Sequence, residues 1–245
     1  MITLNGLNCN IKFGIELEFY IENIKEEHLL FESIKNKISL LDFFCEKENS
    51  ICQYEIKSTC YTNFNKLIKH FILAKKLISE TAQKFGGNAS FKAKPYLNRA
   101  GSALNIHVNL IDLNNRNLFY CNKQKYSKHL IYSIGGLCAM MRKYMSFFAP
   151  NKNSYLRFKY PDIHTPTTIS WGVNNRTTAI RVLNSENKCR LEHRVPGADC
   201  NLEKVLKVII KSIVFGIKNK VIPPNRIYGI ASDLQYKMES LIKNS

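Results

Sequence analysis

In the segment from residue 189 to residue 195, charged side chains occupy every second position from Arg190 to Arg194. If the segment forms a strand, one face carries leucine, histidine and valine, and the other carries two guanidinium groups and one carboxylate. An ordinary half-buried strand places small or neutral polar residues on its second face. A face of this kind is suited to hold both a phosphate and a cation. The charged residues are Arg190, Glu192 and Arg194, and those of the other face are Leu191, His193 and Val195.

Three further segments combine an apolar face with a face rich in acidic, amide or imidazole groups. Each alone is compatible with the solvated outer face of a sheet. Four together favour one shared site, because solvated faces prefer Lys, Thr and Ser over clustered Glu and Arg. The polar faces carry Glu16 and Glu18 in 11–21, Gln53 and Glu55 in 51–57, and Asn105, His107 and Asn109 in 103–111, while Glu48 lies just before the second segment.

The charge balance points to an anion site rather than to a nucleic-acid partner. Lys and Arg number 36 against 19 Asp and Glu, a net charge of +17, but no run of five basic residues occurs. The many Lys, Asn and Ile residues suggest a compositional origin for the charge, so nucleic-acid binding is not expected as the main function. Only nine residues are Arg, and where Lys is the default cation, Arg is expected where its planar fork must hold carboxylate or phosphate. Five of the nine cluster in the second half of the chain: Arg157, Arg176, Arg181, Arg190 and Arg194.

The remaining composition favours a reduced cytoplasmic location. Eight Cys residues show no CxxC pair and no metal-type spacing with His, so we expect buried thiols. The N-terminus lacks the pattern of a signal peptide. Apolar stretches such as 130–141 are too short to span a bilayer, and no membrane association is expected.

The order of the elements predicts an α+β fold. Groups of strands with helices between them suggest a curved, mainly antiparallel sheet, with helices packed on its apolar face and the polar face left concave. Residues 1–245, with 45% hydrophobic residues, can bury one core and are expected to form a single domain. Strands are expected at 11–21, 51–59, 89–94, 102–111, 167–173, 178–184 and 189–195, and helices at 63–85, 126–147, about 201–218 and after Asp233, with a short helical piece within 25–44 and a proline-containing loop between 147 and 167.

Six segments along the chain form one ordered set: Gly14–Tyr20, Glu48 with Gln53–Glu55, Gly101–His107, Asn153–Phe158, Trp171–Thr177 with Ile180–Val182, and Arg190–Arg194 with Gly197–Asn201. In this order they resemble the catalytic domain of the glutamine synthetase family. The residues of the fifth and sixth segments are closest to those of the γ-glutamylpolyamine synthetase branch.

The resemblance implies an ATP-dependent ligase that joins the γ-carboxylate of glutamate to ammonia or a small amine through a γ-glutamyl phosphate. Mg²⁺ or Mn²⁺ would be bound at two sites, since carboxylates suit both ions. The implied ligands are Glu18, Glu48 and Glu55 for one ion, and Glu16, Glu192 and, more weakly, Asn105 for the other. The implied substrate-binding residues are Arg157, Arg194 and Gly101, with His107, Arg190 and Arg176 for the nucleotide, and Arg176 and Arg181 for the transferred phosphoryl group.

The sequence departs from the family pattern at several positions. Asn105 stands where the family has the first His of its His-x-His pair. His164 stands near the position of the acidic residue that takes a proton from ammonium, and we keep it as a candidate base beside a purely structural role. Asn201 begins a triplet that lacks the family's Pro and Tyr. The chain begins at the metal strand, so we expect no N-terminal small domain and a monomer or small oligomer with an open active site.

Three functions remain open on these grounds. The first is an active glutamate–amine ligase of reduced size. The second is a degenerate, non-catalytic relative that binds nucleotide or a partner protein. The third is a phosphotransferase or ligase that acts on another carboxylate or guanidino substrate. The retention of five candidate metal-binding Glu and five clustered Arg favours the first, because facing charges are costly to keep without a ligand.

Overall fold

The computed structural model describes residues 3–4, 7–48, 50–119, 126–184 and 189–242. Within these residues one nine-stranded sheet has the order β3-β4-β2-β6-β9-β8-β7, and β1 and β5 pair with β2 beside this path. Every pairing is antiparallel except β7 with β8. The strands are β1 (Thr3–Leu4), β2 (Cys9–Glu22), β3 (Phe43–Lys47), β4 (Gln53–Ser58), β5 (Asn88–Ser90), β6 (Leu104–Ile111), β7 (Trp171–Val173), β8 (Ile180–Leu183) and β9 (Arg190–His193).

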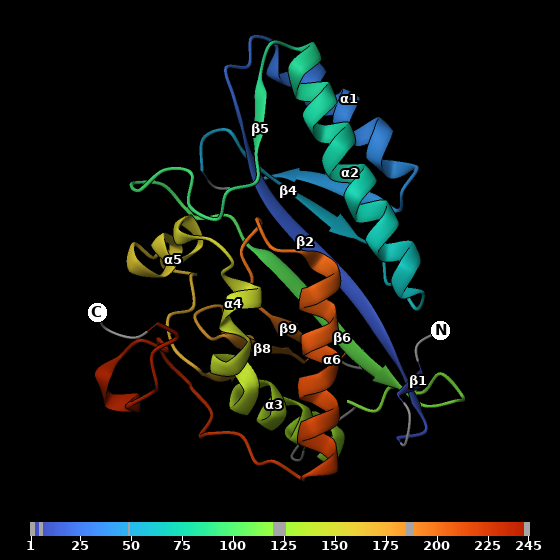
Figure 1. Cartoon of the computed structure of the whole chain (residues 1–245), viewed down its shortest axis with the longest axis vertical. Helices are drawn as coiled ribbons and strands as arrows, with labels where there is room; N and C mark the ends of the chain where they lie inside the picture. The colour runs from blue at the N-terminus through green and yellow to red at the C-terminus, as the bar shows by residue number, and fades with distance from the viewer. Residues whose placement is uncertain (1–2, 5–6, 49, 120–125, 185–188, 243–245) are drawn as a thin grey trace.

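Strand β2 organises the sheet and runs diagonally through Figure 1. Its odd positions from Ile11 to Ile21 are all buried, whereas Glu16 and Glu18 are partly exposed on the opposite face. Because side chains alternate along a strand, one face of β2 packs in the core and the other is left for polar groups. The α+β class and the mainly antiparallel sheet are therefore confirmed, with one parallel pair added.

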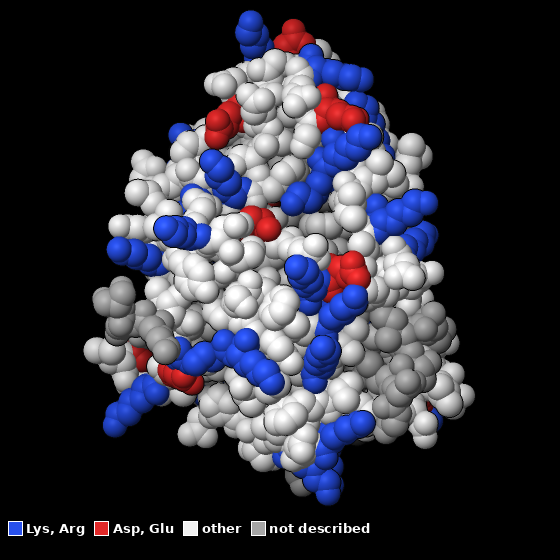
Figure 2. Space-filling model, in the orientation of Figure 1, with Lys and Arg blue, Asp and Glu red and all other residues white. Residues whose placement is uncertain are grey.

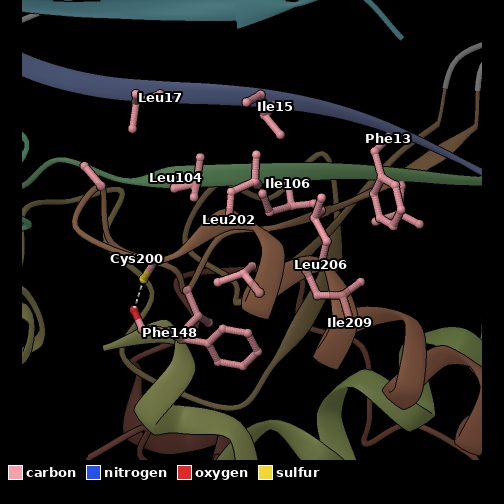
Figure 3. Packing of buried hydrophobic residues seen from close by; sticks show 14 of the residues in the cluster. Phe13, Ile15, Leu17, Leu104, Ile106, Phe148, Cys200, Leu202, Leu206 and Ile209 are labelled. Carbon is pink, nitrogen blue, oxygen red and sulfur yellow. Dashed lines mark hydrogen bonds between the residues drawn. The ribbon is translucent and has the colours of Figure 1, made fainter. Parts of the chain in front are cut away.

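Helices α2, α3 and α6 lie in front of the sheet in Figure 1 and cover its apolar face, whereas α5 lies to the left of the sheet. Figure 3 shows that Leu202, Leu206 and Ile209 of α6 face apolar side chains of β2 and β6. Helix α6 begins at a capping Asn201 whose side chain accepts from the Lys204 backbone. The helices are α1 (Glu27–Ser39), α2 (Phe64–Lys84), α3 (Lys128–Met141), α4 (Met145–Phe148), α5 (Lys152–Lys159) and α6 (Leu202–Lys218), with 3₁₀ turns η1 (Arg142–Tyr144) and η2 (Leu234–Tyr236).

Helices α3 and α6 cross with their backbones in contact. A Cβ on Gly136 would come within 2.1 Å of the Ser212 carbonyl oxygen, and a Cβ on Gly216 within 2.1 Å of the Tyr132 carbonyl oxygen. Only glycine fits at this crossing. The close approach fixes α6 against the rest of the helical layer.

Several expectations about the type or the bounds of the elements were wrong. The region expected to be a linker with a short helical piece forms the 13-residue α1 and then β3. The proline-containing loop includes helix α5, which carries Arg157. No α-helix follows Asp233 in the described part of the chain, where the only helical turn is η2. Helix α3 also ends at Met141, before the expected 147, and β5 covers only the start of 89–94.

The basic charge is spread over the face that carries the helices. Figure 2 shows Lys and Arg in small groups separated by uncharged surface. None of the described helices is long and apolar enough to cross a membrane. Most described cysteines are buried as expected, but Cys52 is half-buried and Cys60 is exposed, while Cys121 lies outside the described residues.

Candidate active site

The strand register brings the polar faces together into adjacent rows. Glu18 pairs with Glu55 across β2 and β4, and Glu16 pairs with Asn105 across β2 and β6. In the next row, Glu192 of β9 stands between His107 of β6 and Arg181 of β8. Directly paired residues place their side chains on the same face, so the four polar faces form one surface.

The first acidic group consists of Glu18, Glu48 and Glu55. One carboxylate oxygen from each lies within 4.8 Å of the others. The Ala103 backbone N–H donates to Glu18 Oε2 at 2.8 Å and holds this carboxylate in place. Burial raises the pKa of Glu18 to about 7, and burial with the nearby negative charge of Glu16 and Glu18 raises the pKa of Glu55 to about 8. The oxygen donors of these carboxylates suit Mg²⁺ or Mn²⁺.

The second group consists of Glu16, His107 and Glu192, whose ligand atoms also lie within 4.8 Å of one another. Nε2 of His107 lies 3.0 Å from Oε1 of Glu16. Burial acts to raise the pKa of Glu16, but the hydrogen bond and charge of His107, with the charge of Lys57 and the hydrogen bond of Asn105, outweigh it and lower this pKa to about 2. Asn105 is also present, because its Nδ2 lies 3.5 Å from Oε2 of Glu16. Its buried Oδ1 has no hydrogen-bond partner among the described residues, so this oxygen is available to a cation.

Arginines border the second group. Arg181 Nη1 lies 3.1 Å from Oε2 of Glu192, and Arg194 Nη1 contacts the other oxygen of the same carboxylate. Arg190 Nε donates to Nδ1 of His107 at 3.2 Å. Buried Arg157 donates to the Val195 and Arg194 backbone carbonyls. Burial lowers the pKa of Arg157 below the ordinary arginine value.

Two cavities are lined in part by residues of this charged surface. A cavity of 210 Å³ is lined by Glu18, Gly101, Arg157, Asp162, His164 and Arg194, among others. A cavity of 470 Å³ is lined by Glu16, Lys57, His107 and Arg190, among others. Glu18 and Glu48 of the first group thus line a pocket of mixed charge, and Glu16 and His107 of the second group line a larger cavity rimmed by cations. This arrangement can bind a small zwitterion on one side and a polyanion on the other.

Comparison with known proteins agrees with this geometry. The family described as "Glutamine synthetase, catalytic domain" matches residues 43–244. The chain belongs to the glutamine synthetase family. Among its curated relatives, the gamma-glutamylputrescine synthetase PuuA of Escherichia coli (strain K12) is 34% identical over 71% of this chain. The glutamate--isopropylamine ligase of a Pseudomonas species is 34% identical over 73%, and the glutamine synthetase of Thermotoga maritima is 33% identical over 64%.

A solved structure of a GmaS/ADP complex shares the fold. Its TM-score is 0.83 at 20% identity, with 97% of this chain and 62% of that chain covered. Against the three curated relatives above, the matched region spans 37%, 39% and 37% of their lengths. These relatives are named as ligases of glutamate with an amine, or as glutamine synthetase.

Two expected site residues, Arg176 and His164, have exposed side chains. The side chain of Arg176 is exposed on the loop after β7, and its backbone carbonyl accepts from Arg194 Nε at 3.1 Å. His164 is exposed at the 210 Å³ cavity, where its carbonyl accepts from Arg194 Nη2 at 3.3 Å. Gly101 lies against Arg157, and a Cβ there would come within 2.9 Å of Arg157 Cγ.

Two polar residues at the site were not predicted from the sequence. Asp162 accepts from the Gly101 backbone N–H at 3.2 Å and from that of His164 at 2.9 Å. Burial acts to raise its pKa, but hydrogen bonds from Thr165 and the His164 backbone outweigh it, so the pKa is lowered. Lys57 contacts Glu55 at 2.9 Å. Alternation along β4 could have found Lys57, which shares the face of Glu55, whereas the turn that aims Asp162 at the pocket has no comparable signal.

Proposed function

We propose that this chain is an ATP-dependent ligase that joins the γ-carboxylate of glutamate to ammonia or a small amine, with Mg²⁺ or Mn²⁺. The observation that supports the proposal is the pair of carboxylate groups on one sheet face, which are bordered by arginines and contribute residues to the lining of two cavities. The names of the relatives support the glutamate and amine substrates. The cytoplasmic location and the monomeric or small oligomeric state predicted from the sequence belong to the same proposal.

The proposed reaction has two balanced steps. A γ-carboxylate oxygen of glutamate attacks the terminal phosphorus of ATP, and ADP leaves. The amine then attacks the carbonyl carbon, loses a proton to a base, and expels phosphate with the former carboxylate oxygen. Catalysis would come mainly from positioning and from charge neutralisation around the phosphoryl group.

Each part of the site has an assigned task in this proposal. Glu18, Glu48 and Glu55 would hold one divalent ion, and Glu16 and Glu192 the second, with Asn105 or His107 as a further ligand. These ions would neutralise phosphate charge. Arg157, Arg194 and Gly101 would bind glutamate in the 210 Å³ cavity, and His107 and Arg190 would bind nucleotide phosphates in the larger one. Arg176 and Arg181 would stabilise the transferred phosphoryl group, and His164 would take the amine proton.

The second candidate is a non-catalytic relative that binds nucleotide or a partner protein. Two observations favour it. An amide, Asn105, stands among the second group of ligands, and both oxygens of Glu192 already contact arginines. A site of this kind could bind nucleotide phosphates without arranging them for transfer.

Phosphate release from ATP separates these candidates. The chain is incubated with ATP, Mg²⁺ and L-glutamate, with and without ammonia, putrescine or isopropylamine. We expect release that depends on both glutamate and one of the amines, and a loss of at least 100-fold in Glu192→Gln. Release that needs no amine would indicate leakage of the acyl phosphate to water, and no release under any condition would favour the non-catalytic relative.

A further inference from the structure

Lys57 occupies an unusual place for a lysine, inside a set of candidate metal ligands. It lies on β4 two residues after Glu55, and its Cα pairs with that of Glu16 across β2. Its Nζ lies 2.9 Å from Oε2 of Glu55 and 2.6 Å from Oε2 of Glu46. The side chain is 36% exposed, whereas that of Glu55 is only 4% exposed. The ammonium therefore contacts a buried ligand of the first group from the side of the larger cavity.

The sheet register explains why a cation is needed there. Glu46, Glu55 and Glu18 pair in one row across β3, β4 and β2. Like charges placed directly opposite each other on a sheet repel. Lys57, in the adjacent row, contacts two of these three carboxylates and offsets part of the repulsion. A divalent cation bound to the first group would offset the same repulsion, so the two cations act on the same carboxylate.

We propose that the Lys57 ammonium is a built-in counterion of the first carboxylate group. It holds Glu55 in the absence of metal and lowers the affinity of this group for a divalent ion. The inference rests on the metal-binding part of the proposed function. A divalent ion must take Glu55 from the ammonium or bind against its positive charge. Lys57 thereby sets the metal concentration at which the first group fills.

Calorimetric titration with Mn²⁺, without nucleotide, tests the inference on the full chain. Compared with the unmodified protein, we expect Lys57→Met to bind Mn²⁺ on the order of tenfold more tightly, because one positive charge close to the ion is removed. Lys57→Arg keeps the charge and should stay within about threefold. The Mn²⁺ affinity of Lys12→Met should stay within about twofold of that of the unmodified protein. This variant removes the same charge from the same cavity, but Lys12 forms no described ion pair with these carboxylates.

The unfolding temperature is a second measurement, which distinguishes a change in metal binding from misfolding. Without metal, Lys57→Met should unfold at a lower temperature than the unmodified protein, and Mn²⁺ should raise its unfolding temperature more. Unchanged or weaker Mn²⁺ binding by a folded Lys57→Met, judged by circular dichroism, would overturn the role of Lys57 while leaving the proposed ligase intact. Absence of Mn²⁺ binding in every variant would instead overturn the metal site on which both proposals rest.

Discussion

At the scale of single residues, His193 couples stability to pH through its burial. Its ring packs against Phe148 with centroids 4.6 Å apart, and neither ring nitrogen has a hydrogen-bond partner among the described residues. Burial lowers its pKa from 6.5 to about 3. Between these values the unfolded chain binds a proton that the folded protein does not, so folding stability falls as the pH drops through this window.

His193→Leu should therefore reduce the acid sensitivity of the protein. The variant removes one titrating group, so it should lose about 2 kcal/mol less unfolding free energy than the unmodified protein between pH 7 and pH 5. Urea unfolding at the two pH values measures this difference. An equal loss in both proteins would show that His193 is not held neutral in the fold.

The buried carboxylates Glu18 and Glu55 should make the metal-free protein less stable as the pH rises, the opposite of the trend caused by His193. They should also make metal binding strongly dependent on pH. The pKa values of Glu18, about 7, and Glu55, about 8, lie above the ordinary value of 4.5. The folded state keeps these protons longer than the unfolded state, so the two groups reduce stability as the pH rises from about 4.5 towards 8. Below these pKa values, protons compete with the metal ion for the same carboxylates, so Mn²⁺ affinity should rise at least tenfold from pH 6 to pH 8. Calorimetry at the two pH values measures this affinity, and a constant affinity would contradict the prediction.

At the scale of elements, the crossing of α3 and α6 should be intolerant of any added atom. Gly216→Ala would place a methyl group against the Tyr132 carbonyl oxygen and the Gly136 backbone. The helices would have to separate, at a cost of about 3 kcal/mol or more. Urea unfolding of this variant, compared with Lys211→Ala on the exposed face of α6, measures the cost. The control should stay within about 0.5 kcal/mol, and a similarly small effect of Gly216→Ala would show that the helices are less closely packed.

The elements differ in how well a local sequence pattern predicts them. Strands β2, β4, β6 and β9 were predicted because strict alternation over several residues is typical of a strand with one buried face. Helix α5 was missed because neighbouring prolines suggested a loop, although its capping pair, Asn151 and Ser154, was a local helix signal. Strand β3 was missed because only Phe43 and Cys45 are buried in a five-residue strand. The terminal turn is too short to have a periodic pattern, and Lys237 ends it with a φ of 48°.

At the scale of the whole molecule, alternation predicted which residues share a face but not which side chains would touch. The set Glu16, Glu18, Glu55 and Glu192 on one surface follows from period-two patterns in separate strands. The contacts of Glu192 with Arg181 and Arg194 depend on strand register and on the loop after β9. The same is true of Lys57 with Glu46, because β3 itself was not predicted. Contacts between strands distant in sequence are set by tertiary packing, which no local pattern contains.

The transfer of oxygen from glutamate to phosphate tests the proposed function most directly. The chain is supplied with ATP, Mg²⁺, an amine substrate and L-glutamate labelled with ¹⁸O in its γ-carboxylate, and the released phosphate is examined by mass spectrometry. If glutamate is activated as an acyl phosphate, each released phosphate carries one oxygen from the γ-carboxylate, and the γ-glutamyl amide appears in equal amount. Phosphate free of ¹⁸O, released from ATP by water alone, would contradict the account.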